Sequence, residues 1–297
     1  MAILLTGASG FVGGFVQRRS PCVALSDAAG EVDLRDAERV REGVTAVRPD
    51  AVIHLAAQSF VPASFCDPRE TFDVNLMGTL NLLMALTDAG FRGRMLFIGS
   101  GDAYGVVPEQ ELPATENRPL RPLNPYAVSK AAGEALCYQW SQTQRFAVIM
   151  TRSFNQLGPG QSDRFAISNF ARQIVAIRRR QREAVLSVGD IDVTRDYTDV
   201  RDAVDAYMLL LERGRNGETY NVCSGSERSM RSILMRMLEL AGVEARIEQD
   251  ASRMRSAEQR RMWGSFEKLR RDTEWQPSIT IDRSLHDILQ FWEKRQS

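Results

Sequence analysis

The chain has 297 residues, which is enough for one large or two ordinary domains. Hydrophobic residues make up 43% and charged residues 26%, as in globular proteins, and no apolar run reaches membrane-spanning length. The 38 basic residues balance the 38 acidic ones, so no overall field favours nucleic acid or an anionic membrane as a partner. The four cysteines are scattered without a Cys-x-x-Cys pair, which argues against disulfides and zinc and fits a cytoplasmic protein without a metal.

The N-terminal segment predicts a dinucleotide-binding turn. Residues 3–5 form a short apolar run that ends at Thr6, as a buried parallel strand would. Gly7, Gly10 and Gly13 follow, and glycines between a strand and a helix let backbone N–H groups approach a pyrophosphate. A tight turn without a ligand is the alternative, but the position directly after a strand favours cofactor binding.

The choice between NAD and NADP stays open in the sequence. Residues 23–25 are interpreted as the second strand, which Asp27 follows, with Asp33 further on. An acidic residue about 20 positions past the glycines can hold a ribose hydroxyl or an adenine amine. Three arginines lie close enough in sequence to bind a ribose 2′-phosphate instead: Arg18, Arg19 and Arg35.

Strand and helix patterns then alternate along the first half of the chain. Helices are expected at 36–47 and 67–89, and strands at 51–54, 94–100 and 146–150. This alternation predicts an α/β fold with a Rossmann-type, doubly wound parallel sheet, whose ligand site lies at the carboxyl ends of its strands. His54 lies in an apolar strand, so it is interpreted as a hydrogen-bonded core residue and not as a catalytic base.

Tyr126 and Lys130 stand four residues apart at the start of a helical pattern, so both side chains can point to one spot. A nearby lysine charge favours the phenolate and lowers the pKa of the tyrosine. Such a phenol can act as general acid or base in a carbonyl/alcohol interconversion. The pair alone is common on exposed helices. The catalytic interpretation therefore depends on the glycines and Ser100 elsewhere in the chain.

The second half is less regular. A Gly- and Pro-containing loop at 151–161 marks a plausible domain boundary, and residues 219–222 form a strand that could rejoin the first sheet. We expect a Rossmann domain and a smaller C-terminal substrate-binding domain. The first would hold residues 1–160 with 190–222 returning to it, and the second residues 161–189 and 223–297.

Arginines are concentrated near the C-terminus. They fit either the binding of a doubly charged phosphate ester through forked donors or a solvated basic helix face. The residues are Arg253, Arg255, Arg260, Arg261, Arg270 and Arg271.

Together, the glycine trio, Ser100, Tyr126 and Lys130 resemble the short-chain dehydrogenase/reductase family. The length and the Gly-x-x-Gly-x-x-Gly spacing resemble its extended branch, which modifies sugar nucleotides. The likeness covers nearly the whole chain, and within the branch it is greatest to GDP-6-deoxy-4-keto-D-mannose reductases. The segments that carry it are 54–59, 73–79, 152–161, 188–196, 220–225 and 253–261.

The resemblance implies roles for individual residues. Tyr126 would protonate the sugar oxygen. Lys130 would lower the pKa of Tyr126 and hold the nicotinamide ribose, and Ser100 would hydrogen-bond the substrate carbonyl. The implied cofactor contacts are Gly7, Gly10, Phe11, Val12, Gly13, Asp33, Leu34, Leu55, Ala56, Ala57, Gln58, Asn75 and Lys130. The implied substrate contacts are Asp102, Asn155, Arg195 and Arg255.

The chain also departs from related sugar-nucleotide 4,6-dehydratases. Those enzymes carry an acid, usually Glu, two residues after the Ser/Thr position, and some add Asp directly after it. Here the two positions hold Asp102 and Gly101, and the shorter carboxylate would reach the sugar poorly, which favours a simple reductase. The usual Arg-Pro pair of the C-terminal segment is Arg255-Ser256, so Arg255 matches its motif less well.

The resemblance therefore implies NAD- or NADP-dependent reduction of the C4 ketone of GDP-4-keto-6-deoxy-D-mannose to GDP-D-rhamnose by a cytoplasmic homodimer. One alternative is a 4-epimerase or a reductase that gives the C4 epimer. Another, of a different class, is a non-catalytic NAD(P) sensor on the same fold.

Overall fold

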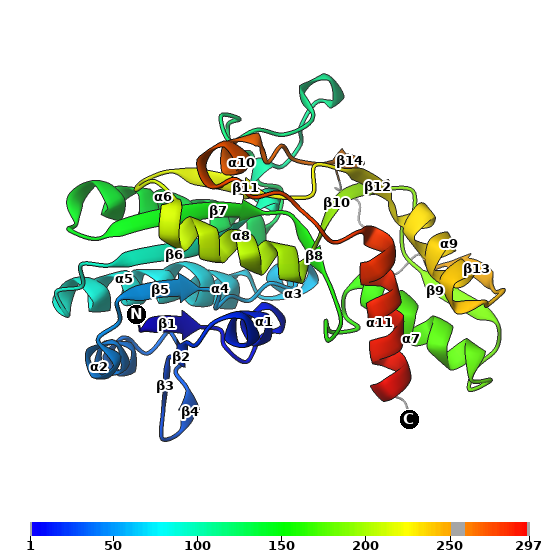
Figure 1. Ribbon diagram of the computed structural model, residues 1–297, viewed down its shortest axis with the longest axis horizontal. Coiled ribbons are helices and arrows are strands. Elements are labelled where there is room, and N and C mark those ends of the chain that lie inside the picture. The colour runs from blue at the N-terminus through cyan, green and yellow to red at the C-terminus, as the bar shows by residue number, and fades with distance from the viewer. Residues whose placement is uncertain (1, 251–258, 296–297) are drawn as a thin grey trace.

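The computed structural model describes residues 2–250 and 259–295. A parallel sheet with helices on both faces stands beside a smaller group of helices and short strands (Figure 1). None of the helices in these two ranges has the length and apolarity that spanning a bilayer requires.

The main sheet has six parallel strands in the order β11-β7-β6-β5-β1-β2. From β1 the chain builds outward on both sides, which is the doubly wound arrangement and confirms the predicted fold class. The segment 219–222 does rejoin this sheet, beside β7. The strands are β1 Ile3–Thr6, β2 Val23–Ala24, β5 Ala51–His54, β6 Arg94–Ser100, β7 Ala147–Ser153 and β11 Thr219–Val222.

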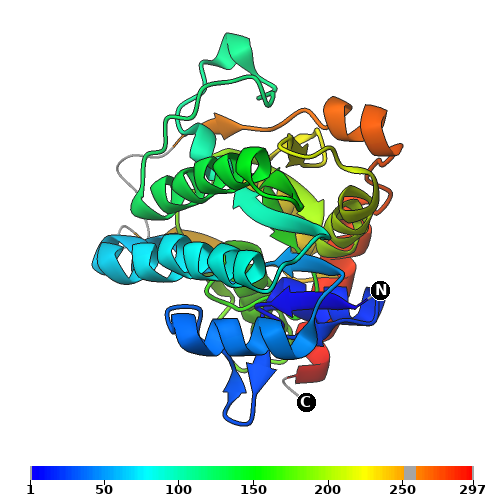
Figure 2. The same cartoon turned by 90° about the vertical axis from the view of Figure 1, so that its left-hand side faces the viewer.

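Successive side chains of a strand point to opposite faces of the sheet, and an apolar cluster lies against each face. Leu4, Val52 and Met95 pack under α2, α5 and α6, which Figure 2 shows side by side in blue, cyan and green. Leu5 and Leu96 face the other way, under α1 and α8. The helices are α1 Phe11–Arg19, α2 Ala37–Val47, α5 Gly78–Asp88, α6 Pro125–Thr143 and α8 Val200–Arg213.

The long helix expected at 67–89 is interrupted by a π turn. α4 (Pro68–Phe72) runs into the π-helical η1 (Asp73–Met77) and then into α5, and a short α3 (Val61–Cys66) precedes them. Such turns insert an extra residue and often occur at functional sites. This one contains Asn75, a predicted cofactor residue.

The second strand is shorter than predicted, because it ends at Ala24 and gives way to a hairpin. The hairpin consists of β3 (Ser26–Asp27) and β4 (Gly30–Glu31), which pair antiparallel. The Asp27 carboxylate accepts from the backbone N–H of Ala29 at 2.8 Å, and Gly30 has a φ of +117°. An aspartate turn followed by a glycine is a typical hairpin connection.

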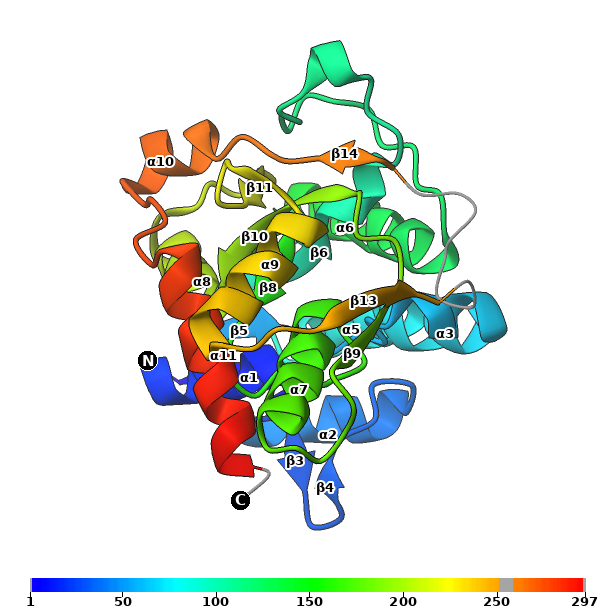
Figure 3. The ribbon, with the colours of Figure 1, turned by 90° about the vertical axis from the view of Figure 1, so that its right-hand side faces the viewer.

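The smaller group of elements is seen in Figure 3. Its core lies among α7, α9 and α11, while α10 packs back against α8. β10 lies between β12 and β14 and also pairs with β8, and β13 pairs with β9. The division of the chain into two domains stays a prediction. The helices are α7 Ala166–Arg178, α9 Met230–Ala241, α10 Glu267–Thr273 and α11 Ile281–Arg295. The strands are β8 Asn155–Leu157, β9 Val185–Val188, β10 Thr194–Asp199, β12 Glu227–Ser229, β13 Arg246–Gln249 and β14 Arg261–Met262.

Candidate active site

The glycine turn after β1 is packed too closely for side chains. Gly7 has a φ of +71°, and a Cβ on it would lie 2.7 Å from the backbone nitrogen of Ala56. A Cβ on Gly13 would lie 2.3 Å from the carbonyl oxygen of Gly7. α1 begins after Gly10 with no side-chain cap and no acidic residue in its first turn. The turn therefore fits the pyrophosphate of a dinucleotide, which the first N–H groups of α1 would bind.

The loop after β5 lies against this turn and is held in place from behind. The backbone N–H of Ala56 donates to the Thr6 hydroxyl at 3.2 Å. The buried Asn75 amide accepts from Gln58 N–H at 2.8 Å and donates to Gln58 C=O at 3.1 Å and to the Ser129 hydroxyl at 2.9 Å. Asn75 thus fastens residues 55–58, which include the predicted Leu55 and Ala57, to the start of α6.

His54 is a core residue, as the sequence indicated. Its ring nitrogens lie 2.7 Å from the Thr6 hydroxyl and 2.8 Å from the Thr79 hydroxyl. Burial, with a smaller effect of Lys130, lowers the pKa of His54 to about 3. The imidazole is therefore neutral at working pH and makes no catalytic proton transfer.

Ser100 and Tyr126 meet at the carboxyl end of β6. Ser100 is buried and begins the 3₁₀ turn η2 (Gly101–Tyr104), and its hydroxyl accepts from the Asp102 N–H at 3.2 Å. Asn124 caps α6 by accepting from the Ala127 N–H at 2.8 Å, which places Tyr126 in the first turn. The Ser100 hydroxyl lies close enough to the Tyr126 side chain to act on the pKa of the phenol.

The pKa of Tyr126 is raised and not lowered, so the expected effect of Lys130 is wrong for this structure. Burial is the main cause, and the Asp102 carboxylate adds to it against the opposing Ser100 hydrogen bond. The Lys130 ammonium is directed elsewhere, because it donates to the carbonyl of Ile98 at 2.8 Å. Burial lowers the pKa of Lys130 to about 8. The phenol consequently stays protonated at neutral pH.

The acidic residues of the second strand region are arranged differently from the prediction. The Asp33 carboxylate is exposed and pairs with Arg35 at 2.6 Å, and Leu34 is buried. Glu31, which the sequence analysis did not single out, contacts the glycine turn by accepting from the Ala8 N–H at 2.8 Å. Its position depends on the β3–β4 hairpin, and the only signal in the sequence was its Asp-Ala-Ala-Gly turn.

Two predicted substrate residues lie on one face of neighbouring strands. Asn155 on β8 is opposite Tyr197 on β10, and Arg195 is two residues from Tyr197, so the side chains of Asn155 and Arg195 share a face. Arg195 donates to the carbonyl of Thr194 at 2.7 Å. Asp102 is exposed. Arg255 lies outside the described residues.

A buried polar group that acts on Tyr126 was not predicted from the sequence. The Tyr207 hydroxyl on α8 lies 2.7 Å from the Ser153 hydroxyl and 2.5 Å from Nε2 of Gln156. The Oε1 atom of Gln156 is buried and has no hydrogen-bond partner among the residues that the structure describes. Because buried acceptors are normally satisfied, this atom is a candidate contact for a bound ligand.

The C-terminal arginines are mostly neutralised by carboxylates. Four of the six belong to the described residues, and each forms an ion pair. The pairs are Arg260–Asp190, Arg261–Glu227, Arg270–Glu267 and Arg271–Asp272. Their density is therefore largely a surface ion-pair pattern.

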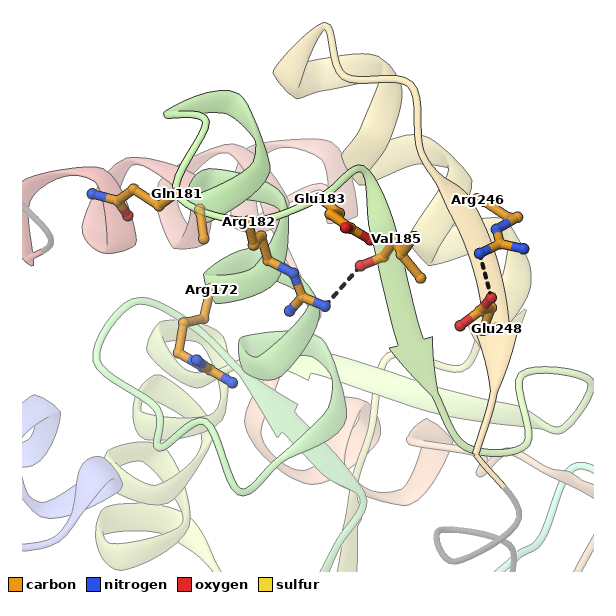
Figure 4. A pocket seen from close by; sticks show the side chains of 8 residues that line it. Arg172, Gln181, Arg182, Glu183, Val185, Arg246 and Glu248 are labelled. Atoms are coloured by element: carbon orange, nitrogen blue, oxygen red, sulfur yellow. Dashed lines mark hydrogen bonds and ion pairs between the residues drawn. The ribbon is translucent and has the colours of Figure 1, made fainter.

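An open hollow of about 640 Å³ lies away from the residues discussed above, between α7, β9 and β13 (Figure 4). It mixes both charge signs: Arg246 pairs with Glu248 at 2.6 Å, and Arg182 donates to the carbonyl of Val185 at 2.8 Å. None of the predicted catalytic, cofactor or substrate residues lines it.

The doubly wound sheet, the glycine turn and the Ser100–Tyr126 pair define a dinucleotide-binding protein of the short-chain dehydrogenase/reductase class. Residues 27–288 match the family described as GDP-mannose 4,6 dehydratase. The chain belongs to this family.

Individual relatives agree with the family. The chain is 46% identical to GDP-6-deoxy-D-mannose reductase of Pseudomonas aeruginosa, over 99% of this chain and 97% of that protein. The structure of RMD from Pseudomonas aeruginosa complexed with NADPH is 45% identical, with a TM-score of 0.93 over 99% of both chains. UDP-glucose 4-epimerase of Thermus thermophilus, in complex with NAD, is 30% identical, with a TM-score of 0.87 over 98% of this chain and 99% of that chain.

Proposed function

We propose that the protein reduces the C4 ketone of GDP-4-keto-6-deoxy-D-mannose to GDP-D-rhamnose with NADPH or NADH. The observation that carries the proposal is the meeting of Ser100 and Tyr126 at the end of β6, in a chain 46% identical to a GDP-6-deoxy-D-mannose reductase. When bound, a reduced dinucleotide would supply the hydride that C4 accepts. The glycine turn, with Phe11 and Val12 at the start of α1, would hold its pyrophosphate.

Ser100 and Tyr126 handle the substrate oxygen. The Ser100 hydroxyl donates to the ketone oxygen and polarises the carbonyl, while the Tyr126 hydroxyl gives up its proton to that oxygen. Because its pKa is raised, Tyr126 is protonated before the reaction and can act as the proton donor. Because an alkoxide is a stronger base than a phenolate, the transfer remains favourable. The Lys130 ammonium, held by the Ile98 carbonyl, places a positive charge beneath the site.

The geometry after Ser100 favours reduction over dehydration. A dehydratase needs a carboxylate next to the sugar C5 and C6 atoms. At position 101, a Cβ would lie 3.1 Å from the ring of Phe154, so an aspartate there would be crowded. At position 102 the aspartate side chain is exposed. We therefore assign Asp102, with Asn155, Arg195 and Arg255, to substrate binding.

The direct test supplies the ketone enzymatically. The protein is mixed with the product of a GDP-mannose 4,6-dehydratase and NADPH or NADH, and loss of the reduced-nicotinamide absorbance is followed. NMR of the product then gives the configuration at C4. Consumption of one cofactor per GDP-D-rhamnose supports the proposal. The C4 epimer would identify the other reductase, interconversion without net cofactor loss an epimerase, and absence of turnover a non-catalytic sensor.

We also propose that the protein is a homodimer formed through α5 and α6. Large apolar side chains are exposed on these helices and on η1, including Met77, Met84 and Tyr138, and exposed apolar patches often mark protein–protein interfaces. Met77 and Met84 lie seven residues apart, close to one helical face.

The dimer can be tested by light scattering after size exclusion. Met84→Glu combined with Tyr138→Glu should yield a monomer, because charges would be buried at the interface. Met235→Glu on α9 is the matched control, since Met235 is as exposed as Met84, at 51% and 50%, and lies in the other group of elements. A double variant with unchanged mass would refute this interface.

Since none of the four cysteines forms a disulfide, we further propose that the protein works in the cytoplasm.

A further inference from the structure

Glu31 occupies the edge of the glycine turn. Its two carboxylate oxygens accept from the backbone N–H of Ala8 at 2.8 Å, from the N–H of Ser9 at 3.3 Å and from the Ser9 hydroxyl. The short β3–β4 hairpin brings it there, since β2 ends at Ala24 and β4 returns antiparallel to β3. The side chain is otherwise exposed, so these contacts leave it open to a ligand.

A carboxylate beside the first glycine turn of a Rossmann fold hydrogen-bonds the ribose hydroxyls of NAD. The same place must hold the 2′-phosphate when NADP binds. A phosphate would meet a negative charge there, and the two backbone N–H groups that could have received it are already bound to Glu31.

The nearby cations do not offset this charge. Arg35 pairs with Asp33 at 2.6 Å, and Arg39 pairs with Asp27 at 2.6 Å. The other two arginines that the sequence offered for a 2′-phosphate are also engaged: the Arg18 guanidinium lies 4.1 Å from the centre of the Phe15 ring, and Arg19 pairs with Asp205 at 2.6 Å. Recruiting any of them to a phosphate would break an existing contact.

We propose that Glu31 is the cofactor-selecting residue and that the protein prefers NADH to NADPH. This inference rests on the proposed function, because it concerns the cofactor of the same reaction. It also separates this chain from the RMD structure of Pseudomonas aeruginosa, which is complexed with NADPH.

Equilibrium binding tests the proposal without turnover. Dissociation constants of the full-length protein for NADH and NADPH are measured by calorimetry, together with 5′-AMP and adenosine 2′,5′-bisphosphate as probes of the adenosine end alone. The wild type should bind NADH about 10- to 100-fold more tightly than NADPH, and the fragments should follow the same order. Glu31→Gln removes the charge but keeps an oxygen for the Ala8 N–H, and it should reduce the preference about tenfold or more.

Two further variants make the result specific. Glu38→Gln in the first turn of α2 removes another exposed carboxylate and should leave the ratio unchanged. Asp33→Asn tests the acidic residue favoured by the sequence, and it should also keep the ratio because Asp33 is paired with Arg35.

Tighter binding of NADPH by the wild type would overturn the proposal, as would a ratio that responds to Asp33→Asn and not to Glu31→Gln. Failure to bind either dinucleotide would instead refute the proposed function itself. Comparison of kcat/KM for NADH and NADPH then checks that the preference persists in turnover.

Discussion

Replacing Asn75 by leucine should loosen the junction between the cofactor loop and the catalytic helix. Asn75 is 2% exposed, and its amide makes three hydrogen bonds, two to the backbone of Gln58 and one to the Ser129 hydroxyl. Ser129 in turn donates to the carbonyl of Tyr126 at 2.7 Å. Leucine has a similar size but no polar atoms, so the N–H and C=O of Gln58 would lose their partner.

The magnitude follows from those two groups. An unsatisfied buried donor or acceptor costs about 1–3 kcal/mol. Gln58 is only partly buried, which admits some water and favours the lower part of that range. We expect Asn75→Leu to lower the free energy of unfolding by about 2–4 kcal/mol. The KM for the cofactor should also rise, because residues 55–58 lie against the glycine turn.

Urea denaturation followed by tryptophan fluorescence measures the change in unfolding free energy. Asn81→Leu is the matched control, since its amide on α5 donates to a single well-placed carbonyl, that of Leu34, at 2.8 Å. Its loss should be about half as large. An Asn75→Leu protein as stable as the wild type, or less affected than Asn81→Leu, would refute the reasoning.

Two further predictions concern pH and the glycine turn. Burial lowers the pKa of Lys130 to about 8. If the charged lysine holds the nicotinamide ribose, as the resemblance implies, kcat/KM for the cofactor should fall as pH rises through that value. An unfolded lysine keeps its proton to about pH 10.4. Between about pH 8 and that value the unfolded chain therefore binds more protons than the folded one, and Lys130 makes the free energy of unfolding rise with pH. The loss of activity in this range is therefore not caused by unfolding. A limb near the usual histidine pKa of about 6.5 that disappears when His54 is replaced would contradict a neutral His54. Gly13→Ala should abolish dinucleotide binding, measured by calorimetry, because its Cβ would lie 2.3 Å from the Gly7 carbonyl oxygen. Gly14→Ala should bind normally and gain about 0.5–1 kcal/mol in unfolding free energy, since its Cβ meets only an arginine tip at 3.6 Å. Equal behaviour of the two variants would contradict the packing described for the turn.

The main sheet could be predicted because its strands are short apolar runs with helical patterns between them. The strand 219–222 was also predicted, although it lies far along the chain from its neighbour β7. The β3–β4 hairpin was not predicted, because two-residue strands carry no periodicity. Nor was the π turn at Asn75, which an apolar pattern does not distinguish from a regular helix.

The chemistry of the site was only partly predictable. Spacing placed Tyr126 and Lys130 on one helix, but it could not show that the ammonium is bound by the Ile98 carbonyl or that burial dominates the pKa of the phenol. Likewise, neither Glu31 nor Tyr207 belongs to a sequence motif. Only the tertiary fold brings Glu31 to the glycine turn and Tyr207 to Ser153. Such contacts depend on packing that a sequence pattern does not encode.

The central claim is that Tyr126 hands a proton to the sugar oxygen as the ketone is reduced. The most direct measurement is turnover of Tyr126→Phe on the 4-keto sugar with saturating cofactor, beside the dissociation constant of the GDP-sugar. We predict that kcat falls about 10²–10⁴-fold, equivalent to about 3–5.5 kcal/mol, while GDP-sugar binding stays close to that of the wild type. Turnover within a few-fold of the wild type would contradict the assignment of the proton donor.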